Sequence, residues 1–325
     1  MSKSPIPAGI AIHQFAGLQA GPKLIVLGAV HGNEVCGTLA IQQLIAEIEN
    51  GTVRIERGTL TLVPVTNPLA YRLKRRHGDR NLNRNMRVSD APQDFEDRIA
   101  NLLCPLLQAH DVLLDLHSFH TPGTPFAMIG PSHNRGELEP FARASEEEAM
   151  ALRLGIGRFV EGWLDTYAQG VKDRQARGAE ASVDYGVGTT ETMRRYGGIA
   201  ITLECGQHEE DTAPQVAYEA IRNTLAHLGM TRAAAPAPAK KREVIRLYQV
   251  TDRLHPEDHL DRDWRSFEPV QRDEVIARRH DGTVLKAERD GWIVFPNPLA
   301  QVDQEWFYLA EPSQRLSGDA TSVCV

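Results

Sequence analysis

Short apolar runs rich in β-branched residues alternate with amphipathic segments through the first 230 residues of the chain. The apolar runs, which are typical of buried strands, lie at 24–30, 59–65, 111–117 and 199–204. The segments with helical spacing of apolar residues lie at 35–49, 94–110 and 214–229. This alternation predicts an α/β fold whose sheet has mostly buried strands.

The middle and the end of the chain show other patterns. Residues 138–169 have mostly helical spacing, and the polar, glycine-rich residues that follow, through about 190, predict loops. The stretch 231–242 is rich in Ala, Pro and Lys, has no apolar face and predicts a linker. Short alternating runs beyond it predict a small β domain over 243–325, frayed from 313 onward. We therefore expect a large domain over 1–230 followed by a small one.

Composition is that of an ordinary globular protein, with 42% hydrophobic and 24% charged residues. No apolar run reaches the about 18 residues that a membrane-spanning helix needs. The first residues also lack the pattern of a targeting peptide. The cysteines have no paired spacing and stand at positions 36, 104, 205 and 324. We expect a cytoplasmic protein with reduced thiols and no membrane partner.

The net charge of −7 argues against a nucleic-acid partner, because neutralising phosphates requires a basic face. The stretch RLKRRHGDR, at 72–80, is the one dense basic patch in the sequence. It is either a solvated loop or an anion-binding site, and charge alone does not decide between the two.

A metal site is indicated where two predicted strands end. The motif HGNE supplies His31 and Glu34 directly after the first apolar run, and His117 ends the run at 111–117. Two imidazoles and one carboxylate form a common catalytic zinc set that leaves a position open for water. Each motif alone is weak, since a histidine at a strand end is more often structural. Asp115 falls on the same strand face as His117, and His120 is a competing ligand.

Two further features supply chemistry beside such a metal. Glu204 ends the apolar run IAITLE, so a carboxylate stands where the core closes and is suited to act as a general base. The basic stretch 67–84 follows another predicted strand and returns to the same sheet edge. From it we select Arg76, Asn83 and Arg84, because arginine suits carboxylate capture and oxyanion stabilisation.

Taken together, these motifs resemble the succinylglutamate desuccinylase and aspartoacylase family, which is related to the zinc carboxypeptidases. HGNE, NP, NLNR, DLHS and LECG stand in the family's order and spacing over about residues 20–230. The resemblance implies a zinc-carboxypeptidase-like mixed sheet flanked by helices, with a small carboxyl-terminal β domain. It is specific for the superfamily and much less so for the substrate.

The resemblance also implies roles for individual residues. His31, Glu34 and His117 fall on the family's ligands for one Zn²⁺ per chain, and Glu204 on its general base. Arg76 falls on the arginine that polarises the scissile carbonyl. Asn83 and Arg84 fall on the pair that grips the substrate carboxylate.

The sequence departs from the family pattern at several positions. Asn81 stands where an Asp is usual. The arginine that binds a substrate side-chain carboxylate corresponds to Arg194, which we select, or to Glu191, and the two predict opposite substrate charge. Tyr308 is a candidate for the tyrosine that the β domain contributes.

These inferences predict a zinc-dependent hydrolase that cleaves the amide bond of a small N-acylated amino-acid-like substrate. The main alternative is a zinc carboxypeptidase acting on a small peptide, followed by a non-catalytic metal- or anion-binding protein. A third alternative makes Cys205 a nucleophile beside His208. Assembly into a homo-oligomer is left open.

Overall fold

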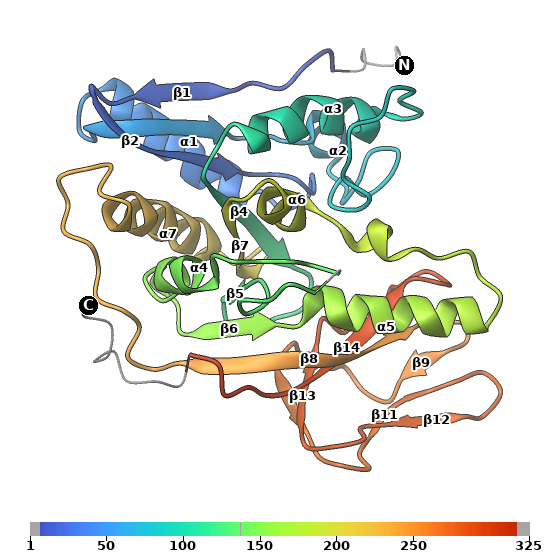
Figure 1. Cartoon of the computed structure of the whole chain (residues 1–325). Coiled ribbons are helices and arrows are strands. Elements are labelled where there is room, and N and C mark those ends of the chain that lie inside the picture. Colours follow the sequence, from blue (N-terminus) through green and yellow to red (C-terminus); the bar gives the residue numbers. More distant parts are fainter. Residues whose placement is uncertain (1–6, 137, 317–325) are drawn as a thin grey trace.

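The computed structural model describes residues 7–136 and 138–316, and its centre is one continuous mixed β-sheet (Figure 1). The strands lie in the order β1-β3-β2-β4-β7-β5-β6-β8-β14-β13-β10. Their bounds are β1 His13–Ala16, β2 Gln19–Leu27, β3 Arg57–Val63, β4 Val112–Phe119, β5 Phe126–Met128, β6 Arg158–Glu161, β7 Ile199–Gln207, β8 Glu243–Asp252, β10 Glu268–Val270, β13 Gly291–Val294 and β14 Glu305–Pro312. The predicted α/β class with a mixed sheet is confirmed.

Helices cover both faces of the sheet's amino-terminal half (Figure 1). Along β2 the buried side chains alternate: Leu24 and Val26 pack toward α1, α4 and α7, whereas Ile25 and Leu27 pack toward α3 and α6. Apolar side chains on both faces are what a strand between two helical layers requires. The helices are α1 Cys36–Glu49, α2 Pro68–Leu73, α3 Phe95–Gln108, α4 Ala144–Ala151, α5 Trp163–Ala176, α6 Thr189–Arg195 and α7 Ala213–His227, with a short 3₁₀ helix at Val183–Gly186.

The helical prediction for residues 138–169 is wrong in part. Helix α4 is confined to Ala144–Ala151, and the strand β6 interrupts the expected helix before α5 begins. Phe159 and Val160 on β6 are fully buried because β6 lies between β5 and β8 inside the sheet. The predicted loop through about 190 was also too long, since it contains the end of α5 and the start of α6.

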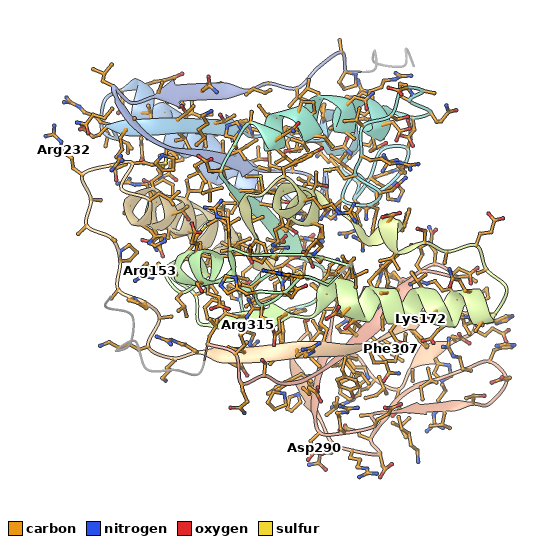
Figure 2. All side chains as sticks on the ribbon, viewed as in Figure 1. Arg153, Lys172, Arg232, Asp290, Phe307 and Arg315 are labelled. Carbon is orange, nitrogen blue, oxygen red and sulfur yellow. The ribbon has the colours of Figure 1, made fainter. Side chains whose placement is uncertain are left out.

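The carboxyl-terminal strands extend the main sheet. The predicted linker 231–242 contains no helix or strand, and β8 then pairs in parallel with β6. A second, three-stranded sheet contains β9 His259–Leu260, β11 Val275–Arg278 and β12 Val284–Lys286. After β14, Arg315 turns back and its guanidinium reaches Glu148 on α4 and Glu161 on β6 (Figure 2). The predicted division into two domains stays a prediction.

In the described part of the chain, no helix is long and apolar enough to cross a membrane. The predicted frayed tail falls mostly on 317–325, outside the described residues, and Cys324 lies there too.

Candidate functional site

The HGNE turn connects the end of β2 to the start of α1. Its backbone closes through a hydrogen bond that the Glu34 amide donates to the His31 carbonyl oxygen, 3.1 Å away. Gly32 lies so close to α2 that a Cβ atom there would meet the Ala70 backbone at 2.0 Å. Only a glycine at this position allows α2 to pack against the turn, and this packing fixes the orientation of the His31 and Glu34 side chains.

The structure brings together the three side chains that the sequence predicts as metal ligands. His117 comes from β4, and β2 and β4 are parallel neighbours, so their carboxyl ends share one edge of the sheet. The two oxygens of the Glu34 carboxylate lie 2.9 Å from His31 Nδ1 and 2.8 Å from His117 Nδ1. One ligand atom from each residue fits within 4.8 Å of the others, and all three residues are buried. His120 is not part of this group among the described residues.

Electrostatics at this cluster suit a cation. Burial and the nearby Arg76 lower the pKa of His31 to about 4, which leaves its imidazole neutral at pH 7. Burial would raise the pKa of Glu34, but the two imidazoles outweigh it and hold that pKa well below the usual range. Burial would lower the pKa of His117, but Asp115 and Glu34 outweigh it and raise that pKa well above its usual value. Metals bind a neutral imidazole and an ionised carboxylate, so His117 would give up its proton on metal binding, whereas His31 and Glu34 already have the required forms. The buried Nδ1 of His31 also has no well-aligned hydrogen-bond partner among the described residues.

Two outer residues orient the imidazoles. Asn81 Oδ1 lies 2.9 Å from His31 Nε2, and Asp115 Oδ2 lies 3.0 Å from His117 Nε2. Thr189 donates a hydrogen bond to that same Asp115 oxygen. Such partners fix the tautomer and rotation of a metal-binding histidine. The side-chain amide of Asn81 thus contacts His31, a predicted metal ligand. The sequence showed only that Asn81 replaces the family's usual Asp, and did not reveal this contact.

Glu204 lies directly beside this cluster. Strands β4 and β7 are parallel, and their register places Glu204 opposite His117. The carboxyl group is buried, and its Oε2 atom has no hydrogen-bond partner among the described residues. Burial raises the pKa of Glu204 to about 8, with Glu34 acting in the same direction and His117 and Arg76 opposing it. A carboxyl group that exchanges its proton near neutral pH can serve as a general acid and base.

The basic loop divides into residues that face the site and residues that hold the loop in place. Arg76 is half exposed and donates a hydrogen bond to Glu34 Oε1 at 2.9 Å. Arg80 instead binds Asp94 and Asp97 at the start of α3. The fully buried Glu96, next to them, accepts hydrogen bonds from the backbone amides of residues 78, 79 and 80. The sequence analysis missed Glu96, because a glutamate in the first turn of a helix usually interacts with the helix itself.

Asn83 joins the basic loop to the start of α6. Its side-chain oxygen accepts a hydrogen bond of 2.8 Å from the Thr189 amide, the first residue of α6. The neighbouring Gly188 leaves room for this contact, since a Cβ there would meet Asn83 Oδ1 at 2.1 Å. The loop and the helix are therefore held together at the wall of the site.

Arg84 packs against aromatic side chains and pairs with a carboxylate. Its guanidinium lies 5.0 Å from the centre of the Trp163 ring and 3.4 Å from Glu305 on β14. Tyr308, also on β14, is buried, and its hydroxyl has no partner among the described residues. Burial raises the pKa of Tyr308 well above its usual value, with Glu305 adding to the effect. Strand β14 thus contributes two polar side chains to the site.

Arg194 and Glu191 both come from α6 but have different surroundings. Arg194 is only 3% exposed and binds Glu147 through Nε and Nη2, Glu139 through Nη1 and the carbonyl oxygen of Ala200 through Nη2. Glu191 accepts hydrogen bonds from its own helix start. The binding of a substrate by Arg194 stays a prediction.

A cavity of about 890 Å³ connects these groups. It is lined by one predicted ligand pair, His31 and His117, and by Glu204, together with residues of the basic loop, of α6 and of β14. The size suits a small organic molecule.

Sequence comparison agrees with this geometry. Residues 20–228 match the succinylglutamate desuccinylase/aspartoacylase catalytic domain. The chain belongs to this family. The predicted resemblance is therefore confirmed, and the matched range contains every predicted ligand and Glu204.

Solved structures of succinylglutamate desuccinylase/aspartoacylase proteins share the fold. A protein of this description from Rhodobacter sphaeroides is 19% identical with a TM-score of 0.70, over 94% of this chain and 90% of that one. The Vibrio cholerae succinylglutamate desuccinylase is 20% identical with a TM-score of 0.69, over 93% and 85%. The ectoine utilization protein EutE (DoeB) from Ruegeria pomeroyi, in a product-bound structure, is 21% identical with a TM-score of 0.66, over 92% and 88%. Desuccinylases and aspartoacylases are hydrolases that remove acyl groups, and this is the reaction type of the family.

The alternative cysteine mechanism conflicts with the structure. Cys205 is buried, and burial raises the pKa of its thiol well above the usual value. His208 Nδ1 lies 2.8 Å from the Ser118 hydroxyl. A nucleophilic cysteine needs a lowered pKa and an adjacent base, and Cys205 lacks the first of these.

Proposed function

We propose that this protein is a zinc-dependent hydrolase that removes the acyl group from an N-acyl amino acid. One observation carries the proposal: the unpartnered, buried carboxyl group of Glu204 lies in register with His117, beside the cluster of His31 and Glu34. The donor set is the one that catalytic zinc prefers, and the base stands next to it in the same cavity.

The residues of the chain divide the reaction between them. His31, Glu34 and His117 would hold the zinc ion, which would supply a Lewis acid and lower the pKa of water. Glu204 takes the proton of the attacking water and delivers it to the nitrogen of the departing amine. Arg76 stabilises the negative charge that develops on the carbonyl oxygen.

Substrate positioning falls to the loop and its neighbours. Asn83 and Arg84 hold the carboxylate of the amino acid, for which a planar guanidinium is well suited. The substrate carboxylate then competes with Glu305 for Arg84, since these two side chains are 3.4 Å apart. Fixing the substrate at this end brings its amide bond to Glu204 in a constant geometry.

A hydrolysis screen tests the proposal. The zinc-loaded protein and the chelator-treated protein are compared on acetyl, succinyl and other acyl derivatives of amino acids with acidic, neutral and basic side chains, and on small peptides. We expect zinc-dependent release of the free amino acid. Faster cleavage of peptides would favour a carboxypeptidase instead, and one bound metal per chain without any hydrolysis would favour a binding protein.

The role of Glu204 is tested by Glu204→Gln. The variant should bind zinc as the parent protein does and lose activity about 10²- to 10⁴-fold, because the proton carrier is gone. Glu209→Gln, an exposed position on the same segment, serves as the control and should remain fully active. Undiminished turnover by Glu204→Gln would remove this residue from the mechanism.

A further inference from the structure

The cavity that contains Glu204 is also lined by acidic side chains from other elements. Thr202 lies two residues before Glu204 on β7, so both side chains face the same side, about 7 Å apart. Both line the cavity, as do Glu191 from α6 and Glu139 from the segment before α4. We call Glu139 and Glu191 the acidic wall. The acidic wall and Glu204 line the same cavity, so the wall is part of the proposed active site.

Arg194 neutralises this wall only in part, because its single guanidinium contacts Glu139 at 3.0 Å and Glu191 at 3.8 Å but also binds a third carboxyl group. Glu147, which is fully buried, engages Nε and Nη2 of its guanidinium at 2.8 and 3.2 Å. Gly130 has no side chain, and this lets the Arg194 guanidinium pack directly against the backbone at residue 130. A Cβ atom at this position would meet Arg194 Nε at 2.3 Å. One guanidinium is thus shared among the three carboxyl groups of Glu139, Glu147 and Glu191, so acidic groups remain in excess.

The two wall carboxylates keep acceptor capacity. Glu139 accepts one hydrogen bond, from Arg194 Nη1 at 3.0 Å, and Glu191 accepts bonds from the Gly188 amide and the Thr190 hydroxyl. A carboxylate has about four acceptor positions. In the described part of the chain, no Lys or Arg other than Arg194 forms an ion pair with either residue. Burial raises the pKa of Glu139 to about 7, with Arg194 opposing and Glu191 adding to the rise.

The wall stands next to the carboxylate-binding residues. Glu191 binds the amide of Gly188 at the start of α6, and Asn83 binds the amide of Thr189, the very next residue. An amino acid held by Asn83 and Arg84 would therefore lie beside the acidic wall, within reach of its side chain.

We propose that the acidic wall binds an ammonium or guanidinium group on the side chain of the substrate, so that the protein acts on N-acyl derivatives of basic amino acids. This inference rests on the proposed deacylase function and names its substrate class. The buried, unpartnered Glu204 Oε2 and Tyr308 hydroxyl face the same cavity and mark it independently as a ligand site. A substrate with a carboxylate side chain would instead meet two carboxylates of like charge.

Matched substrate pairs test the substrate class. Nα-acyl ornithine and lysine are compared with Nα-acyl norvaline and norleucine, which differ only by lacking the terminal amine, and with Nα-acyl glutamate. The acyl group is the one that the hydrolysis screen prefers. We expect kcat/KM to be at least about tenfold higher for the basic member of a pair, and lowest for glutamate. Equal values, or a preference for glutamate, would overturn the inference.

Variants of the wall identify its residues. In each of the variants Glu139→Gln and Glu191→Gln, the ratio of kcat/KM for the basic substrate to kcat/KM for the uncharged substrate should fall about tenfold. The amide at position 191 retains an oxygen for the Gly188 amide, and Glu139→Gln tests the wall separately should α6 be disturbed. Glu146→Gln, an exposed position beside Glu147, is the control and should keep the preference of the parent protein. An unchanged preference in both wall variants would remove the wall from substrate selection.

A binding measurement separates this inference from the proposed reaction. Titration calorimetry with free ornithine, norvaline and glutamate requires no turnover. Tighter binding of ornithine than of norvaline and glutamate, lost in Glu139→Gln, would support the acidic wall. If no acyl derivative were hydrolysed at the same time, only the deacylase function would be contradicted. Hydrolysis of acyl amino acids without any preference for ornithine would contradict the wall alone.

Discussion

Glu34 and Glu204 show how position decides the chemistry of one residue type. Both carboxyl groups are buried, Glu34 in the turn between β2 and α1 and Glu204 on β7. Two imidazoles hold the pKa of Glu34 well below its usual range, whereas burial raises the pKa of Glu204 to about 8. The first is therefore an anion suited to bind a cation, and the second a group that can carry a proton at neutral pH.

Asn81 offers a prediction at the scale of one residue. Its side-chain oxygen lies 2.9 Å from His31 Nε2 and fixes which imidazole nitrogen is left for a metal. Asn81→Ala should weaken zinc binding about 10- to 100-fold, as measured by competition with a chromophoric chelator. Asn81→Asp keeps the acceptor and should bind zinc at least as tightly as the parent protein. Equal affinities for Asn81→Ala and an exposed control, Asn50→Ala, would show that position 81 does not support the ligand.

At this scale the sequence was informative where a residue ends a strand. His31, Glu34, His117 and Glu204 could be proposed because polar residues interrupt apolar runs at positions that parallel strands bring to one edge. The supporting contact of Asn81 could not, since it depends on the path of an irregular loop. Sequence spacing does not determine such a path.

At the scale of elements, helix starts hold the loops that form the site. The buried Glu96 on α3 binds three consecutive amides of the basic loop, and the start of α6 binds Asn83. These contacts explain why a loop with many arginines has a defined shape. The strand β6 was mistaken for helix because four residues are too few to show alternation, and neighbouring helical residues dominate any longer window.

A second prediction concerns the turn between β8 and β9. Asp258 is buried and accepts hydrogen bonds from the amides of Leu254, His255 and His280 and from the Arg279 guanidinium. Burial would raise the pKa of Asp258, but Arg279 and the amides outweigh it and lower that pKa well below 3.8. A lowered pKa means that the ionised carboxylate stabilises the fold at pH values above 3.8, and that this stability is lost as the pH falls toward the folded-state pKa.

Asp258→Asn should therefore lower the free energy of unfolding at pH 7 by about 3 kcal/mol, since Arg279 loses its buried partner. The difference between variant and parent should shrink as the pH falls below 4, because the unfolded parent then binds a proton at Asp258 that the folded parent does not. Urea unfolding between pH 7 and pH 3 measures both effects. The exposed Asp263→Asn provides the control. A constant difference across this pH range would contradict the assigned role of the Asp258 charge.

At the scale of the whole molecule, the carboxyl-terminal strands are joined to the catalytic part. The sequence predicted short β strands after a linker, but not that β8 pairs with β6 and so continues the main sheet. That pairing joins residues about 85 positions apart, as in the register of Arg158 with Glu243, and local patterns carry no information about it. The same arrangement brings Glu305 and Tyr308 of β14 to the cavity.

This continuity leads to a last prediction, for a chain that ends at residue 242. Its β6 edge would lose the partner β8, and the buried residues Phe126 and Val160 would lose the cover of Ile245 and Tyr308. An unpaired edge next to exposed apolar side chains favours aggregation. We expect the shortened chain to be mostly insoluble, or aggregated in size-exclusion chromatography, under conditions in which the full chain elutes as a single species. A soluble, monodisperse fragment that unfolds cooperatively would show instead that the first 242 residues form an independent domain, as the linker in the sequence suggested.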